Sequence, residues 1–144
     1  MLALDTDGTK QAEHFINAVG EDLSGRLIPA VEVRLRGLYR LLPPDYYEAA
    51  DNLADFCDRI EKQYGVRPVI YCTERTYKNI VASDSRFNKD KIWYESLFSK
   101  PDEDMDWTFW TYTNRVKFSF YESGEYLHMT VFNGSEDDFK KLII

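Results

Sequence analysis

Segments of strand type and helix type alternate along the first two thirds of the chain, and this alternation limits the possible folds more than any other feature. Apolar and charged residues alternate in Leu27–Leu35, as they do in a half-buried strand. Apolar residues recur at helical spacing over Tyr47–Tyr64, a buried-type strand follows at Pro68–Cys72, and Thr73 can begin a further helix. Ile92–Tyr94 is the next strand. A helix between successive strands implies parallel pairing, and hence an α/β layer or barrel.

The two ends of the chain complete a single domain over residues 1–144. A helix is expected over Ala12–Val19, with Asp7 or Thr9 as its N-cap. The strands expected in the last third are Trp107–Tyr112, Val116–Tyr121 and Tyr126–Phe132, followed by a terminal helix over Ser135–Leu142. The last two strands flank a Glu-Ser-Gly-Glu turn, which is typical of an antiparallel hairpin.

Composition excludes several classes of function. The chain has 144 residues, 44% of them hydrophobic, which suits one globular domain with a core. Its net charge of −7 repels phosphate backbones and anionic lipid, so we expect no nucleic-acid and no membrane partner. The opening residues leave no room for a signal-peptide core, so as written the chain is expected to stay where it is made. Cys57 and Cys72 lack ligand spacing, and we expect buried thiols, no metal and no cofactor.

Several short segments match the motifs of a known enzyme family, in the same order and at similar spacing. The segments are Gln11–Phe15 (Q-A-x-x-F), Leu27–Leu35 (L-P-x-V-D-x-E in outline), Pro68–Thr73 (P-x-I-Y-T), Ile92–Tyr94 (L-W), Trp107–Tyr112 (W-x-F-W-Q-Y) and Thr130–Ser135 (from D-x-N-x-F-x-G). Each match alone is weak, but together they cover nearly the whole chain. The sequence therefore resembles family 25 of the glycoside hydrolases (GH25), the lysozymes or muramidases.

This resemblance implies an irregular, TIM-like (β/α) barrel with its active site at the carboxyl ends of the strands. Family members hydrolyse the bond after N-acetylmuramic acid in peptidoglycan. Their catalytic domains begin with further β/α units, one of which carries an aspartate that points into the site. The match here starts at the Gln11 helix. We therefore expect an incomplete or rearranged barrel that lacks the usual N-terminal units.

The catalytic acids implied by the resemblance are altered. The family D-x-E falls on Glu32-Val33-Arg34, and the aspartate of D-x-N falls on His128. Glycosidic hydrolysis needs a proton donor, and a guanidinium, with a pKa above about 12, does not release its proton. Glu32 keeps a carboxylate on the strand face of Arg34, so it serves either in an ion pair or as a surviving base. We expect His128 to be structural and the domain to be catalytically inactive.

Four aromatic residues match positions where the family stacks sugars. They are Tyr71, Trp93, Trp110 and Tyr112. Strand aromatics often only pack in a core, but aromatic faces also bind pyranose rings. A residual site for peptidoglycan fragments is therefore one expectation for this domain.

Three functions remain open at this stage. The domain binds glycan or a partner protein, or it is an active N-acetylmuramidase with displaced or partner-supplied acids, or it is a remnant without a selected task. A chain that starts after the first barrel units leaves Leu27–Leu35 without a neighbouring strand. We expect that edge to pair with a partner protein or with a second copy, giving a homo-oligomer.

Overall fold

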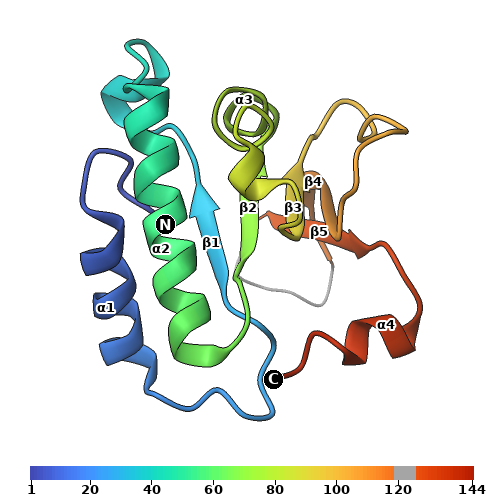
Figure 1. Cartoon of the computed structure of the whole chain (residues 1–144). Helices are drawn as coiled ribbons and strands as arrows, with labels where there is room; N and C mark the ends of the chain where they lie inside the picture. The colour runs from blue at the N-terminus through green and yellow to red at the C-terminus, as the bar shows by residue number, and fades with distance from the viewer. Residues whose placement is uncertain (119–125) are drawn as a thin grey trace.

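The computed structural model describes residues 1–118 and 126–144, and its centre is a five-stranded sheet in sequence order. The strands are β1 (Ala30–Val33), β2 (Val69–Thr73), β3 (Ile92–Glu95), β4 (Phe109–Val116) and β5 (Leu127–Phe132). β1 to β4 pair in parallel and β5 is antiparallel to β4. The α/β class, the parallel early strands and the C-terminal antiparallel hairpin are therefore confirmed. β1 and β5 lie at the two edges, so the sheet is open (Figure 1).

The helices begin and end where local chemistry requires. They are α1 (Gly8–Val19), α2 (Tyr46–Tyr64), α3 (Glu74–Thr76) with the π-helical turn η2 (Tyr77–Val81), the 3-10 turns η1 (Gly37–Arg40) and η3 (Ser85–Phe87), and α4 (Glu136–Lys140). Asp7 accepts from the backbone N–H of Lys10 and is the N-cap of α1. Gly65 ends α2 with φ 75°, a left-handed conformation that favours glycine. The start of α1 and the end of α2 are therefore determined by residues close in sequence to each end.

The core lies between the sheet and the helices α1 and α2, which run side by side next to β1 (Figure 1). Leu53 and Ile60 of α2 are fully buried, together with Val33 and Ile70 on the strands. A Cβ atom on Gly8 would lie 1.8 Å from the backbone oxygen of Asn52, so the start of α1 approaches α2 as only glycine allows. This packing fixes β1, and with it the residues that follow β1.

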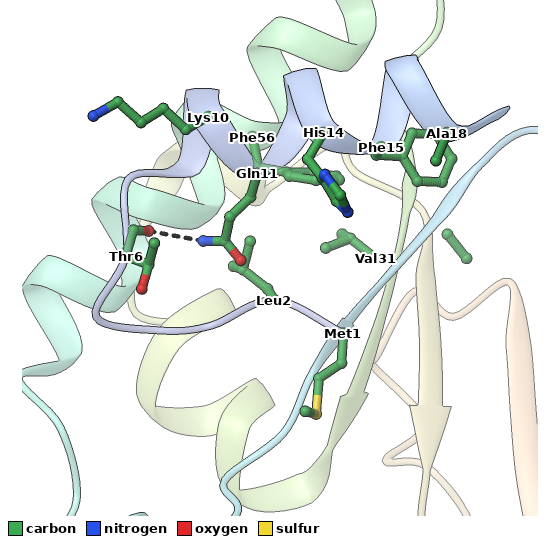
Figure 2. Close-up of a pocket in the computed structure, with 11 residues that line it drawn as sticks. Met1, Leu2, Thr6, Lys10, Gln11, His14, Phe15, Ala18, Val31 and Phe56 are labelled. Atoms are coloured by element: carbon green, nitrogen blue, oxygen red, sulfur yellow. Dashed lines mark hydrogen bonds between the residues drawn. The ribbon is translucent and has the colours of Figure 1, made fainter. Parts of the chain in front are cut away.

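The segment before α1 is hydrogen-bonded to β1 and to α1. The backbone N–H of Leu2 donates to the carbonyl of Glu32 on β1 at 2.9 Å. The Gln11 side chain accepts from the backbone N–H of Ala3 at 2.7 Å and donates to the carbonyl of Ala3 at 2.9 Å. It also donates to the carbonyl of Thr6 at 2.8 Å (Figure 2). Gln11, the first residue of the Q-A-x-x-F match, thus holds residues 1–6 in place.

A cavity of about 520 Å³ lies between α1 and β1 (Figure 2). Its lining includes Leu2, His14, Phe15, Val31 and Phe56. It adjoins the outer edge of β1, where the expected pairing with a partner would occur. Association at this edge stays a prediction.

Three boundaries differ from those expected. The strand expected over Leu27–Leu35 is shorter, and Leu27 instead forms an isolated bridge with Ile143. One strand, β4, runs from Phe109 to Val116 with register shifts after Thr111 and Thr113, so it covers most of the expected Trp107–Tyr112 strand but only the first residue of the expected Val116–Tyr121 strand. Residues 119–125, which contain the expected turn, lie outside the described residues. α4 also ends at Lys140 rather than at Leu142, although the capping box at Ser135 is present.

Two further observations concern membranes and metals. Within residues 1–118 and 126–144, no helix is long and apolar enough to cross a membrane. The same described residues contain no cluster of three or more histidine, cysteine or acidic side chains arranged to hold a metal ion.

Candidate functional site

The carboxyl ends of β1, β2 and β3 meet at the edge of the sheet where η1 and α3 begin (Figure 1). The strand register places Glu32, Tyr71, Trp93 and Phe109 opposite one another in one row across the sheet. Val33 and its neighbours in the next register position are buried in the core. Because side chains alternate between faces, the first row lies on the opposite face, away from α1 and α2. We call this face of the sheet and its carboxyl-end rim the cleft, because two hollows that share Thr73 and Arg75 lie along the rim.

Arg34 lies at the centre of the cleft and its N–H groups are largely occupied. Its Nε donates to Glu32 at 2.7 Å, and its two Nη atoms donate to the two carboxylate oxygens of Glu95 at 3.0 and 2.5 Å. One Nη also donates to the Tyr71 hydroxyl at 3.2 Å, and that hydroxyl donates to Glu95. Arg36 lies 3.7 Å from Glu32 and adds a second positive charge. The expected ion pair between Glu32 and Arg34 is present, within a larger network.

This network determines which groups hold protons. Burial acts to raise the pKa of Glu95, but hydrogen bonds from Arg34 and Tyr71 and the charges of Arg34 and His128 outweigh it, so the pKa lies below its ordinary value. The hydrogen bond to Glu95 raises the pKa of Arg34, against the opposing effect of burial. Burial and the hydrogen bond to Glu95 raise the pKa of the Tyr71 hydroxyl. At neutral pH Glu95 is therefore ionised, and Arg34 and Tyr71 keep their protons.

Glu95 is the residue that sequence reasoning missed. It ends β3, its side chain is 9% exposed, and it contacts Arg34 from 61 positions further along the chain. One signal was available, because Glu95 follows Trp93 by two positions and so shares its face of the strand. The alternation of side chains along a strand therefore predicts that Glu95 lies on the same face as Trp93.

Two threonines continue the cleft towards β5. The indole N–H of Trp93 donates to Thr111 Oγ1 at 2.8 Å, and Thr111 Oγ1 lies 2.7 Å from Thr130 Oγ1. These threonines occupy the positions that the resemblance gives to glutamine and asparagine. His128 is exposed on β5, and its charge reaches Glu95. The positions matched to family site residues on β1, β4 and β5 thus face one cleft.

The four predicted sugar-binding aromatics lie on two opposite faces of the sheet. The rings of Tyr71 and Trp93 lie 4.9 Å apart in the cleft. Trp110 is in register with Tyr94, packs against the core, and donates its indole N–H to the Ser96 carbonyl at 3.0 Å. Tyr112 contacts Trp110 with ring centroids 5.8 Å apart and is 40% exposed. Trp110 and Tyr112 therefore lie on the side of the sheet opposite to the cleft.

The fold and this cleft define an α/β domain whose polar and aromatic site lies at the carboxyl ends of parallel strands. The sequence model of glycosyl hydrolases family 25 matches residues 2–119, and the chain belongs to that family. No curated protein sequence matches it significantly.

Solved structures show the same fold. A family 25 glycosyl hydrolase from Bacillus anthracis superimposes with a TM-score of 0.83 at 28% identity, covering 99% of this chain and 65% of that chain. A muramidase from Trichobolus zukalii gives 0.74 at 18% identity, covering 96% and 67%. The lysozyme from Streptomyces coelicolor gives 0.72 at 23% identity, covering 96% and 66%. The present chain thus spans less than two thirds of the Bacillus anthracis enzyme.

Proposed function

We propose that this family 25 domain binds peptidoglycan fragments in its cleft and does not hydrolyse them. The observation that carries the proposal is the fixed position of Arg34 between Glu32 and Glu95, where the resemblance expects the proton donor. We propose the same for any longer protein that contains this domain: binding without hydrolysis at this cleft.

The chemistry of the cleft opposes hydrolysis at two points. A glycosidase needs a carboxylic acid that is protonated in the ground state, with a pKa near working pH. Glu95 is held ionised by Arg34, and Arg34 itself does not release a proton. If a sugar binds as the resemblance implies, the guanidinium would also lie near the positive charge that develops on the ring, which would disfavour the oxocarbenium-like transition state. Loss of a general acid alone slows such reactions by about 10²–10⁴-fold.

The same cleft has features of a sugar site. The adjacent rings of Tyr71 and Trp93 offer an aromatic surface, and both side chains are only partly buried. Aromatic faces with a few convergent polar groups are common in pockets for small ligands. Glu32 and the exposed Thr130 supply polar groups on the same face. These observations support binding in the cleft rather than at Trp110 and Tyr112.

The test measures turnover and binding on the same sample. Purified cell walls are incubated with the protein and reducing ends are counted, while muropeptide binding is followed by calorimetry. We expect no reducing ends above the buffer control and measurable binding. A rate within about 10²-fold of an ordinary lysozyme would refute the proposal and favour an active N-acetylmuramidase with displaced or partner-supplied acids. If the experiment shows no turnover and no binding, a domain without a retained glycan function is favoured.

A matched pair of variants locates the site. Trp93→Ala removes an aromatic face from the cleft, whereas Tyr112→Ala removes an exposed aromatic from the opposite side of the sheet. We expect the first to weaken muropeptide binding by about 10-fold or more, in line with the cost of losing one stacked ring, and the second to leave it unchanged. Equal effects of both variants would contradict the assignment of the cleft.

A further inference from the structure

A second, smaller hollow adjoins the cleft at the carboxyl ends of β1 and β2. Its volume is about 210 Å³ and its lining consists of Arg34, Leu35, Arg40, Thr73 and Arg75. Three of these five side chains are guanidinium groups and none is a carboxylate. The chain as a whole has a net charge of −7, so this concentration of positive charge is local and opposite in sign to the rest.

Among the described residues, the two outer arginines have no acidic partner. Arg40 ends η1 and Arg75 lies in α3, and Arg75 Nη1 donates to the backbone carbonyl of Arg40 at 3.0 Å. Across residues 1–118 and 126–144, neither guanidinium forms a salt bridge. Glu74, the acid next to Arg75 in sequence, is bound to Lys78 at 2.7 Å.

The third guanidinium, that of Arg34, is already neutralised by Glu32 and Glu95. The hollow therefore carries two uncompensated positive charges, from Arg40 and Arg75. A planar guanidinium binds carboxylate and phosphate oxygens with paired, charge-assisted hydrogen bonds. Pockets that enclose a complete small ligand measure roughly 300–1,000 Å³, so a hollow of about 210 Å³ suits one anionic group of a larger molecule.

That larger molecule has room beside the hollow. The lining of a neighbouring depression of about 470 Å³ includes Thr73, Arg75, Glu95 and Phe98, together with Glu74 and Lys78, which form an ion pair. Thr73 and Arg75 line both spaces, so the two lie next to each other along the rim of the cleft. Phe98 is fully exposed there and presents a further aromatic face.

We propose that Arg40 and Arg75 form a subsite for an oxyanion carried by the glycan ligand. This inference rests on the proposed function, because it names what the glycan must carry. The oxyanion is a carboxylate, as on the lactyl ether and peptide of a muropeptide, or a phosphate, as in a phosphodiester-linked wall polymer. The subsite makes the domain select charged wall fragments over neutral oligosaccharides of the same length.

The experiment compares Arg40→Gln/Arg75→Gln with the parent domain. The three ligands are neutral chitotetraose, a disaccharide-peptide from peptidoglycan and a glycerol phosphate oligomer, each titrated by calorimetry at low and physiological salt. A hydrogen bond to a charged group contributes about 1.5–3 kcal/mol, which corresponds to roughly 10–150-fold in Kd. We expect the double variant to weaken binding of the preferred anionic ligand by at least about 10-fold and to leave chitotetraose unaffected.

Two control variants separate local from general effects. Arg26→Gln/Lys62→Gln removes the same two charges from exposed positions that do not line the hollow, and it should leave all affinities unchanged. Arg40→Gln alone preserves the contact that Arg75 makes with the main chain, so a folding defect does not explain its effect. Equal affinity of the parent and double variant for both anionic ligands would overturn the inference, while muropeptide binding through Trp93 would still stand.

The inference can also be judged if no glycan binds. Inorganic phosphate and acetate are then titrated while the side-chain N–H signals of the arginines are followed by NMR. Saturable shifts at Arg40 and Arg75, but not at Arg26, would support an oxyanion subsite even though the proposed glycan function had failed. An absence of saturable shifts at both would overturn the subsite itself.

Discussion

Replacing Glu95 with glutamine removes one negative charge from the cleft and keeps the size of the side chain. Glu95 accepts two hydrogen bonds from Arg34 and one from Tyr71, and its side chain is only 9% exposed. Glutamine retains one oxygen but turns an amide group towards the guanidinium. Glu95→Gln should therefore leave Arg34, whose side chain is 23% exposed, with Glu32 as its only strong partner.

The size of the effect follows from burial. Exposed ion pairs contribute at most about 1 kcal/mol, whereas removing one partner of a buried pair costs about 3–5 kcal/mol. The Arg34–Glu95 pair lies between these cases, because Arg34 keeps Glu32 and some contact with water. We expect Glu95→Gln to lower the free energy of unfolding by about 2–3 kcal/mol, or the Tm by roughly 5–10 °C for a domain of this size.

The dependence on pH gives a second check. The pKa of Glu95 in the folded protein is lower than its ordinary value of 4.5, because Arg34 and Tyr71 outweigh the effect of burial. A lowered pKa stabilises the fold at pH values above the ordinary pKa, and this contribution is lost as the pH falls through the folded value. The parent and Glu95→Gln should therefore differ fully at about pH 7, and the difference should shrink progressively as the pH falls below the ordinary value of 4.5.

Urea unfolding followed by tryptophan fluorescence measures this difference at both pH values. Asp51→Asn is the matched control, since Asp51 is 68% exposed and pairs with a partly exposed Arg86. It should cost less than about 1 kcal/mol. The reasoning fails if Glu95→Gln costs no more than Asp51→Asn at pH 7, or if its full cost persists at about pH 3.

Three further predictions concern the cleft and the edge of the sheet. Arg34→Glu places a third carboxylate beside Glu32 and Glu95, so we expect the free energy of unfolding to fall as the pH rises past about 5. We also expect this variant to release no reducing ends from cell walls, and robust hydrolysis would contradict this. In Arg34→Gln the burial of Glu95 acts without the guanidinium, so its pKa should rise, and an unchanged carboxyl NMR titration would count against us. The outer edge of β1, bonded at one point to Leu2, should associate, and light scattering that shows a monomer at tens of micromolar would reject that expectation.

The sequence indicated the parts of the fold that depend on local chemistry. The period of apolar residues predicted α2 to within a residue of its bounds. Asp7, one of the two N-cap candidates for α1, is the N-cap, and the terminal helix begins after Ser135 as expected. Strand limits were less accurate, because a strand ends where its partner ends. The Leu27–Leu35 pattern continues past Val33, but the ladder with β2 does not.

The contents of the cleft depended on long-range contacts and were only partly predictable. Glu32 and Arg34 lie only two positions apart, at the end of β1 and directly after it, and their ion pair was expected. Glu95 joins from 61 positions away, and no local pattern links it to Arg34. The alternation rule could have corrected one error, because Thr111 faces the cleft and its neighbour Trp110 must then face the other way.

Arginine at position 34 changes the chemistry of more than one residue. It places a guanidinium at the position that the resemblance gives to the proton donor, and it also holds Glu95 in the ionised form and donates a hydrogen bond to the carboxylate of Glu32. A working general acid needs the opposite setting, an apolar pocket remote from any guanidinium, where burial raises the carboxyl pKa towards neutrality. Returning a glutamate to position 34 does not provide that setting while Glu32 and Glu95 remain beside it. Under the proposed function, hydrolysis would require the charges of the whole cleft to change together, whereas glycan binding would rely on the aromatic surface of Tyr71 and Trp93.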